Sequence, residues 1–261
     1  MIGLIGGSGL ETFIEEGDKI DVETPYGSVS AVKGEISDTE ILFVSRHGPR
    51  HEFPPHKVNY RGNIFSMRKM GVRKILATSA VGALHKTWRL GSIIFPDQQI
   101  DYTRTRHYTF HDNQTVHVDL THPYCPIMSR ILTETGRRLA TPVREGGTYI
   151  CFEGPRFETA AEIRMAKILR ADVVGMTGCP ETALARELGL CYATICIITN
   201  RAAGIQEKVT HEETLEVLER EKRTIGPLLE ASASELDTFR RTKECLSFEE
   251  IGEEFVRRMK A

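Results

Sequence analysis

The chemistry-bearing residue with the most informative position is Asn200. It ends the apolar run CYATICIITN over residues 191–200, and a strand this apolar is typical of a sheet that helices cover on both faces. In open α/β sheets, ligands bind outside the carboxyl ends of the strands. An amide placed there can both donate and accept a hydrogen bond, whereas an ionised Asp can only accept. Asn200 is therefore a candidate for reading the donor and acceptor pattern of a ligand.

Two other predicted strands end in residues that suit an anion. The segment GGSG, residues 6–9, offers backbone N–H groups and the hydroxyl of Ser8. It lacks the Lys of a Walker A loop and the spacing of GxGxxG, so a tight structural turn is equally compatible with it. Arg46 and His47 follow the apolar segment ILFVS, and Arg suits bidentate contacts with phosphate.

Several other residues have a structural interpretation beside the functional one. Ser79 and Ala80, in the segment TSAVGAL, could donate to an anion or form a close-packed turn. Thr177 follows a predicted strand and could join the same site or cap the next helix. Glu158 is predicted in the first turn of a helix, where an acidic side chain often interacts only with the helix dipole. Met176 is of a type found more often in a core. No single motif decides the function.

The histidines do not favour a metal site. His47, His51 and His56 match no common zinc-ligand spacing, so we expect an anion site on a loop stiffened by prolines, and no metal. His211 lies beside a predicted capping box, Thr210 with Glu213, and either decorates the helix start or faces a site. The six cysteines lack CxxC spacing, and we expect them to be reduced in a cytoplasmic protein.

Composition bounds the class of protein. The 261 residues include 27% charged residues, with a formal net charge of −2, which is typical of a globular protein. The chain has no block of like charges, so we expect no nucleic-acid partner. It has no run of roughly 18 apolar residues and no basic segment before an apolar one at its start, so we expect neither a membrane span nor a signal peptide.

Repeated strand–helix units must position these residues. The alternation predicts one α/β domain over residues 1–261, with a mixed, largely parallel central sheet flanked by helices. A C-terminal helical tail, residues 236–261, is expected to open at Ser247 with Glu250. The expected strands are 2–5, 41–45, 74–78, 92–95, 149–152, 172–176 and 191–200, with a hairpin near 20–34, and the expected helices are 59–70, 124–139, 158–169, 181–188 and 210–233.

The motifs taken together, from Ile2 to about Leu218, resemble the trimeric nucleoside phosphorylase superfamily, and more closely its methylthioadenosine phosphorylase branch. The resemblance implies a nucleoside phosphorylase-like sheet that is partly barrel-like. It implies cleavage of a purine nucleoside by inorganic phosphate, as a pentosyltransferase of purine salvage without a cofactor, in a trimer or a dimer of trimers. The matching segments are IGGSGL, TPYG, RHG, VNYR, ATSAVG, IDYT, HPYC, EGPRFET, VGMT, LARE and ITN.

The resemblance also assigns residues to roles. Met176 should lie against the ribose, and Phe157 should stack on or edge the base. Asn200 and Glu158 should address the purine and activate it. His117 should be lent to a neighbouring subunit's site, with His51 on the same rim. The residues expected to hold phosphate are Ser8, Arg46, His47, Ser79, Ala80 and Thr177.

Departures from the family pattern predict the substrate. Adenine-cleaving relatives carry Asp where Asn200 stands, and a second Asp where this chain has Ala202. Glu158 replaces a Ser of those relatives and matches the Glu of inosine and guanosine phosphorylases. A carboxylate can accept the N1–H that only a 6-oxopurine carries. We therefore expect inosine and guanosine as substrates.

Other functions remain open alternatives. His211 matches a His near the 5′-hydroxyl in inosine and guanosine phosphorylases, which favours plain nucleosides. S-methyl-5′-thioinosine or S-methyl-5′-thioadenosine is the alternative substrate. A non-catalytic nucleotide-binding protein on the same scaffold is a remote alternative, and the missing GxGxxG disfavours a dehydrogenase.

Overall fold

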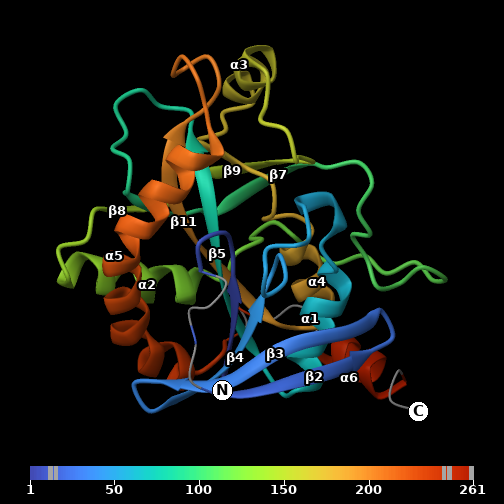
Figure 1. Cartoon of the computed structure of the whole chain (residues 1–261). Coiled ribbons are helices and arrows are strands. Elements are labelled where there is room, and N and C mark those ends of the chain that lie inside the picture. Colours follow the sequence, from blue (N-terminus) through green and yellow to red (C-terminus); the bar gives the residue numbers. More distant parts are fainter. Residues whose placement is uncertain (11–13, 15–16, 243–244, 246–248, 259–261) are drawn as a thin grey trace.

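The central sheet positions every element of the site. The computed structural model describes all residues except 11–13, 15–16, 243–244, 246–248 and 259–261. Among the described residues, eleven strands form one mixed sheet, and the main path of neighbouring strands is β2-β3-β4-β1-β5-β10-β9-β7. Strand β11 pairs with β5 and β6, and β6 pairs with β8. Figure 1 shows how strongly the sheet twists: β2 and β3 run across the view, whereas β5 runs nearly vertically.

The strand bounds follow the apolar segments of the sequence. The strands are β1 (Ile2–Gly6), β2 (Asp18–Thr24), β3 (Gly27–Ile36), β4 (Thr39–Ser45), β5 (Lys74–Ala83), β6 (Ile93–Phe95), β7 (Gln98–Tyr102), β8 (Val143–Glu145), β9 (Thr148–Phe152), β10 (Val173–Gly175) and β11 (Cys191–Arg201). Six of the ten described pairings are parallel and four are antiparallel. The prediction of a mixed, largely parallel sheet is confirmed.

Helices cover both faces of the sheet. They are α1 (Tyr60–Lys69), α2 (Pro126–Arg138), α3 (Ala160–Ile168), α4 (Glu181–Glu187), α5 (His211–Thr238) and α6 (Glu249–Arg258), with a short 3₁₀ turn at Pro55–Lys57. Residues of α2 and α5 join β1 and β11 in one core cluster. Residues of α1 and α4 join other side chains of β1 and β5 in a second. In Figure 1 these two pairs of helices lie on opposite sides of the sheet.

Strand β11 has the double-sided burial that its sequence predicts. Ten of its eleven residues are buried. Its alternate residues pack in different clusters: Ile195 and Ile197 face α2 and α5, whereas Tyr192 faces α1 and α4. The strand pairs with β5 along its whole length, with one irregularity between Ile198 and Asn200.

Some sequence expectations differ from the structure. The sheet is not closed among the described strands, because no pairing joins the outer strands β2 and β7. Strand β5 does not stop at Thr78 but continues to Ala83, because β11 and β10 pair with its second half. Strands β7 and β8 lie in segments where the sequence predicted no strand.

Helix ends differ as well. Helix α3 begins after Thr159, whose capping box with Glu162 fixes the start. Glu158 therefore precedes the helix, and the interpretation as a residue of its first turn is wrong. Helix α5 runs to Thr238, beyond the expected end at 233. The predicted helix start at Ser247 lies outside the described residues. No described helix is long and apolar enough to span a membrane.

Candidate active site

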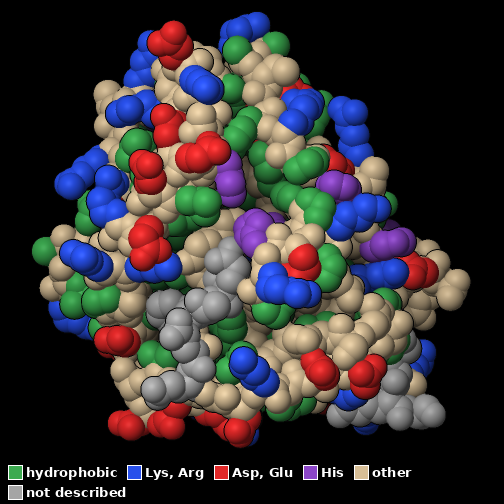
Figure 2. Space-filling view, in the orientation of Figure 1, with side chains coloured by type: hydrophobic (Ala, Val, Ile, Leu, Met, Phe, Trp, Pro, Cys, Tyr) green, Lys and Arg blue, Asp and Glu red, His purple; other side chains and the backbone are tan. Residues whose placement is uncertain are grey.

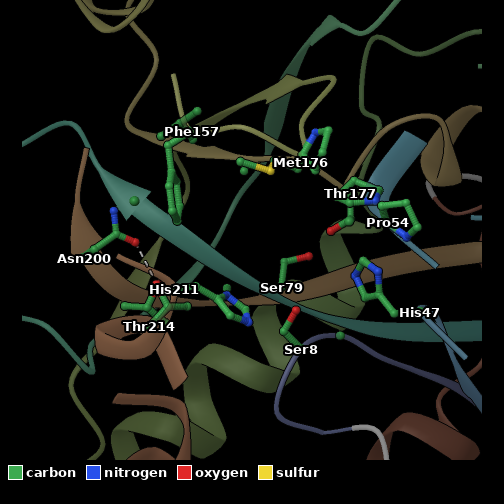
Figure 3. Close-up of a pocket in the computed structure, with 18 of the residues that line it drawn as sticks. Ser8, His47, Pro54, Ser79, Phe157, Met176, Thr177, Asn200, His211 and Thr214 are labelled. Carbon is green, nitrogen blue, oxygen red and sulfur yellow. Dashed lines mark hydrogen bonds between the residues drawn. The ribbon is translucent and has the colours of Figure 1, made fainter. Parts of the chain in front are cut away.

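A cavity of about 360 Å³ opens where the carboxyl ends of the central strands meet. Its wall includes residues that follow or end β1, β4, β5, β10 and β11. In Figure 2 His side chains stand at a hollow in the middle of the same face. Figure 3 shows the labelled side chains converging on the cavity from strands, from loops and from the start of α5. The sequence-predicted residues that line it are Ser8, His47, His51, Ser79, Ala80, Phe157, Glu158, Met176, Thr177, Asn200 and His211.

One end of the cavity, the anion end, consists of Ser8, His47, Ser79, Ala80 and Thr177. Strand β1 pairs with β5 only as far as Ile5 and Ala77, so β5 continues past the end of β1 and Ser79 and Ala80 face open space there. These two residues lie within a strand, not in a turn after one.

Hydroxyl groups give the anion end its chemistry. The Oγ atom of Ser79 is buried and has no hydrogen-bond partner among the described residues. A buried polar group without a partner costs about 1–3 kcal/mol, and a bound oxyanion would remove that cost. The hydroxyls of Ser8 and Thr177 face the same space in Figure 3. Thr177 does not cap α4, because the residue before that helix is Pro180.

His47 is held in one tautomer. Its Nδ1 lies 2.7 Å from the carbonyl oxygen of Phe53, and a carbonyl can only accept, so Nδ1 carries the proton. The His47 ring stacks on the ring of His51, with centroids 4.6 Å apart. His51 is in turn 6.2 Å from the ring of His211. We call His51 and His211 the histidine rim.

The opposite end, the amide end, consists of Phe157, Glu158 and Asn200. The Nδ2 of Asn200 donates to the carbonyl oxygen of Arg201 at 3.1 Å, and its Oδ1 accepts from the hydroxyl of Thr199 at 3.0 Å. Because the Arg201 carbonyl can only accept, it must face the NH₂ group, and this fixes the amide orientation. The second N–H of Nδ2 is the group that the amide can offer to a ligand.

Glu158 is a buried carboxyl group at this end. Burial raises its pKa to about 7, because a carboxylate loses hydration in a poorly solvated site. It therefore exists in both protonation states near neutral pH. A carboxyl group with this pKa in a cavity is typical of a functional site.

The structure does not bring every predicted residue to the cavity. Ala202 is buried but does not line it. Arg46 stands behind the anion end, fully buried, and its guanidinium donates to Glu181 and to the carbonyl oxygen of Thr78. His117 is exposed on the long segment between β7 and α2, which reaches out from the body in Figure 1 (green). Its assigned role, like that of Arg46, stays a prediction.

Some residues of the wall are absent from the predicted set. Gly82 lines the cavity, and a Cβ at this position would lie 2.9 Å from Nδ2 of Asn200. Gly82 lies in β5 beyond the strand end expected at residue 78, so the expected strand gave no signal for this close approach. Thr214 lies on the first turn of α5. Only its spacing of three residues from His211 could have indicated in the sequence that it lines the cavity. Pro54 and Pro55 complete the wall beside His51.

Potential metal ligands gather elsewhere. Among the described residues, the one cluster of three such groups is Cys125, Cys191 and Cys245, whose sulfur atoms lie within 4.8 Å of one another. None of the three lines the cavity. The expectation of a site without metal stays a prediction.

Comparison with known proteins identifies the family. The model of the phosphorylase superfamily matches residues 1–234, and the chain belongs to this superfamily. It is 50% identical over 242 residues to the probable 6-oxopurine nucleoside phosphorylase of Thermococcus kodakarensis, covering 87% of this chain and 90% of that protein. It is 45% identical to the S-methyl-5′-thioadenosine phosphorylase of Pyrococcus furiosus, with coverage of 87% and 90%.

A solved structure agrees with the fold. The methylthioadenosine phosphorylase of Schistosoma mansoni in complex with adenine superposes with a TM-score of 0.89 at 28% identity, over 99% of this chain and 98% of that chain. Overall similarity thus relates the chain to phosphorylases of more than one substrate. The side chains of the cavity must carry the distinction.

Proposed function

We propose that this protein cleaves 6-oxopurine nucleosides, inosine and guanosine, with inorganic phosphate, to give the free base and ribose 1-phosphate in purine salvage. The observation that carries the proposal is the pairing of Asn200 with Glu158 at the amide end, opposite an anion end rich in donors. The 50% identity to a probable 6-oxopurine nucleoside phosphorylase supports it.

The fixed amide of Asn200 suits a 6-oxopurine. N7 and O6 of such a base are both acceptors, and the second N–H of Asn200 Nδ2 can donate to either. Oδ1 already accepts from the Thr199 hydroxyl, and Nδ2 keeps a second N–H beside the one given to Arg201, so the amide has a donor to offer to the base. The exocyclic amine of adenine is a donor and would need an acceptor at this position.

Glu158 adds an independent preference. Its carboxylate accepts the N1–H of a 6-oxopurine and the 2-amino group of guanine, whereas N1 of adenine is itself an acceptor. A mismatched pair of buried polar groups costs about 1–3 kcal/mol, which is roughly a ten- to hundredfold difference in kcat/KM. Two side chains from separate elements thus favour the same class of base.

The reaction needs charge placement more than a strong nucleophile. As the glycosidic bond breaks, positive charge develops on the ribose and negative charge on the base. Phosphate at the anion end would stabilise the ribose cation and then attack its anomeric carbon. Asn200 would stabilise the charge that develops at N7. We propose no metal and no organic cofactor for this chemistry.

The alternative substrates are S-methyl-5′-thioinosine and S-methyl-5′-thioadenosine. The identity of 45% to a thioadenosine phosphorylase supports this class. The histidine rim, together with Thr214, instead gives the cavity a polar wall, which fits a 5′-hydroxyl. A non-catalytic nucleotide-binding protein remains the remote alternative, and the buried donors of the anion end argue against it.

One assay separates these functions. Purified protein is incubated with inosine, guanosine, adenosine and both methylthio nucleosides, with and without phosphate, and release of the base is measured. We expect phosphate-dependent cleavage of inosine and guanosine at least tenfold faster than of adenosine. Equal rates on adenosine and inosine would contradict the proposal, and cleavage of methylthioinosine alone would establish the alternative.

We also propose a cytoplasmic homotrimer, or a dimer of such trimers, in which His117 reaches a neighbouring cavity. The exposure of His117, on a segment that extends from the body of the protomer, supports this role. Mixing an inactive His117 variant with an inactive Asn200 variant tests it. Restored activity in mixed oligomers is expected if the two residues serve one site from two chains.

A further inference from the structure

A buried ion pair lies beneath the anion end of the cavity. Arg46 Nε lies 2.5 Å from Glu181 Oε1, and Arg46 Nη2 lies 2.9 Å from Glu181 Oε2. Neither side chain has any exposed surface. This bidentate arrangement fixes the guanidinium plane. The pair brings together the end of β4 and the first residue of α4, which are 135 residues apart in the chain.

The pair belongs to a larger buried network. The hydroxyl of Tyr192, on β11, donates to Oε2 of Glu181 at 2.5 Å. Burial, and then the nearby Glu181 carboxylate, raise the pKa of Tyr192 well above its usual value, so the phenol keeps its proton. Arg46 Nη1 donates to the carbonyl oxygen of Thr78 at 2.7 Å. The Thr78 hydroxyl accepts from the backbone N–H of Gly7 at 2.9 Å.

The members of this network stand next to residues of the anion end. Gly7 precedes Ser8, Arg46 precedes His47, and Thr78 precedes Ser79. The network therefore fixes the relative positions of three separate strand segments. Because the Glu181 carboxylate neutralises the Arg46 guanidinium, the pair adds no net positive charge to the anion end. Its contribution is to hold these three segments in place.

We propose that Glu181, oriented by Tyr192, is a positioning residue for phosphate, acting through Arg46, Thr78 and Gly7 on the hydroxyls and N–H groups of the anion end. This inference rests on the proposed function, in which phosphate is the co-substrate. It assigns a role to Glu181, which lies four residues after Thr177. It also gives Arg46 a task in the structure that does not require contact with phosphate.

Tyr192→Phe is the sharpest test, because it removes one hydroxyl and leaves the ion pair in place. The Glu181 carboxylate loses the hydroxyl group that orients it, so we expect the KM for phosphate to rise about tenfold while the KM for inosine stays within about twofold. The rise in melting temperature that phosphate produces should shrink in parallel, and this readout does not depend on turnover.

The chain offers a matched control in Tyr124→Phe. Tyr124 is also a buried Tyr, with its ring centroid 6.2 Å from that of Tyr192. Its hydroxyl has no hydrogen-bond partner among the described residues, so we expect no change in the KM for phosphate. If Tyr192→Phe lowers the melting temperature but leaves both KM values and the phosphate-induced stabilisation unchanged, the network is only structural and the inference is wrong.

Glu181→Gln distinguishes two possible roles of the ion pair. Either Glu181 positions the anion end through Arg46, or Glu181 keeps Arg46 from binding phosphate directly. Positioning predicts weaker phosphate binding than in Tyr192→Phe, because the three strand segments lose their common anchor. Tighter phosphate binding would mean that Glu181 only keeps Arg46 away from phosphate, and would overturn the inference. If phosphate stabilises the wild type but the wild type cleaves no nucleoside, the proposed function is wrong. The phosphate-induced rise in melting temperature, compared between the wild type and the variants, then still tests the inference. If phosphate does not stabilise the wild type and no nucleoside is cleaved, both the proposed function and the inference are wrong.

Discussion

The anion end and the amide end of the cavity are held in place by different means. At the anion end, donors lie on or directly after β1, β4 and β5, and the buried Arg46–Glu181 pair stands behind them. At the amide end, Asn200 is the second-last residue of β11, but Phe157 and Glu158 lie on an irregular segment between β9 and α3. Phe157 is 36% exposed, whereas Arg46 is 1% exposed.

This difference separates what the family shares from what distinguishes its members. All phosphorolytic reactions use the same oxyanion, so a rigid site built on strand segments serves each of them. The base varies with the enzyme, and under the proposed function Asn200 and Glu158 determine which base is favoured. The comparison predicts that substitutions at the amide end change the choice of substrate, while substitutions at the anion end change the use of phosphate for every substrate.

The largest expected effect is that of Asn200→Asp. The carboxylate offers only acceptors, so inosine loses a favourable contact while adenosine gains one at its exocyclic amine. We expect the ratio of kcat/KM for inosine to that for adenosine to fall roughly 10- to 100-fold, with the KM for phosphate unchanged. The measurement is a steady-state assay with both nucleosides.

Asn200→Ala serves as the control for that change. It removes the donor without supplying an acceptor, so it should lower activity on inosine without raising activity on adenosine. An Asn200→Asp enzyme with an unchanged substrate ratio would mean that the amide does not contact the base.

Ser79→Ala should affect the opposite end. Its buried hydroxyl has no described partner and faces the anion end. Loss of one hydrogen bond to a charged ligand costs about 1.5–3 kcal/mol, so the KM for phosphate should rise about tenfold or more, equally with inosine and guanosine. Thr194→Val, at a buried hydroxyl on β11 outside the cavity, is the control. A changed base preference in Ser79→Ala would contradict the division between the two ends.

The sequence predicted the residues of the anion end but not the network that holds them. The apolar strands and their polar ends predicted where the anion residues would gather, because parallel strands bring their carboxyl ends to one edge of the sheet. The network beneath them was not predictable: Glu181 in a helix start and Tyr192 in an apolar strand look like ordinary helix and core residues. Their partners are 135 and 11 residues away along the chain, and only the folded sheet brings them together.

Local signals also misplaced some boundaries. Glu158 was expected inside α3, but Thr159 and Glu162 form a capping box that starts the helix at Ala160, two residues later than expected. This leaves the Glu158 carboxyl outside the first turn and directed to the cavity. Similarly, Ser79 was expected beyond a strand that ends at Thr78, either as a donor to an anion or in a close-packed turn, whereas pairing with β11 keeps it in β5. In both cases a contact distant in sequence, or a stronger neighbouring cap, overrode the local preference.

Glu158→Gln tests the pKa of the amide end. Burial raises the pKa of Glu158 to about 7, and the ionised form is the better acceptor for N1–H. The kcat/KM for inosine should therefore increase as the pH rises through about 7. In Glu158→Gln the part of this increase due to Glu158 should vanish, and only the part due to phosphate ionisation should remain. A pH profile identical in shape to that of the wild type would contradict the role of Glu158.

The same variant has a thermodynamic signature that does not involve substrate. The folded protein holds the Glu158 proton more tightly than the unfolded chain, whose pKa is near the ordinary 4.5. Unfolding free energy therefore decreases as the pH rises from about 4.5 to about 7, and the loss is complete above that pKa. Glu158→Gln should lack this decrease, so its melting temperature relative to the wild type should increase between pH 5 and pH 8.

The smallest expected effect belongs to the histidine rim, where the alternative substrates differ. His211→Val replaces a polar wall residue with an apolar one, so activity on inosine should fall about two- to tenfold, the loss of one neutral hydrogen bond. Activity on methylthioinosine should rise, because its 5′ end is apolar. Glu212→Val, on the same helical turn but outside the cavity wall, controls for the effect of Val on the start of α5. Equal behaviour of the two variants would show that His211 only begins the helix and that another residue senses the 5′ end of the nucleoside.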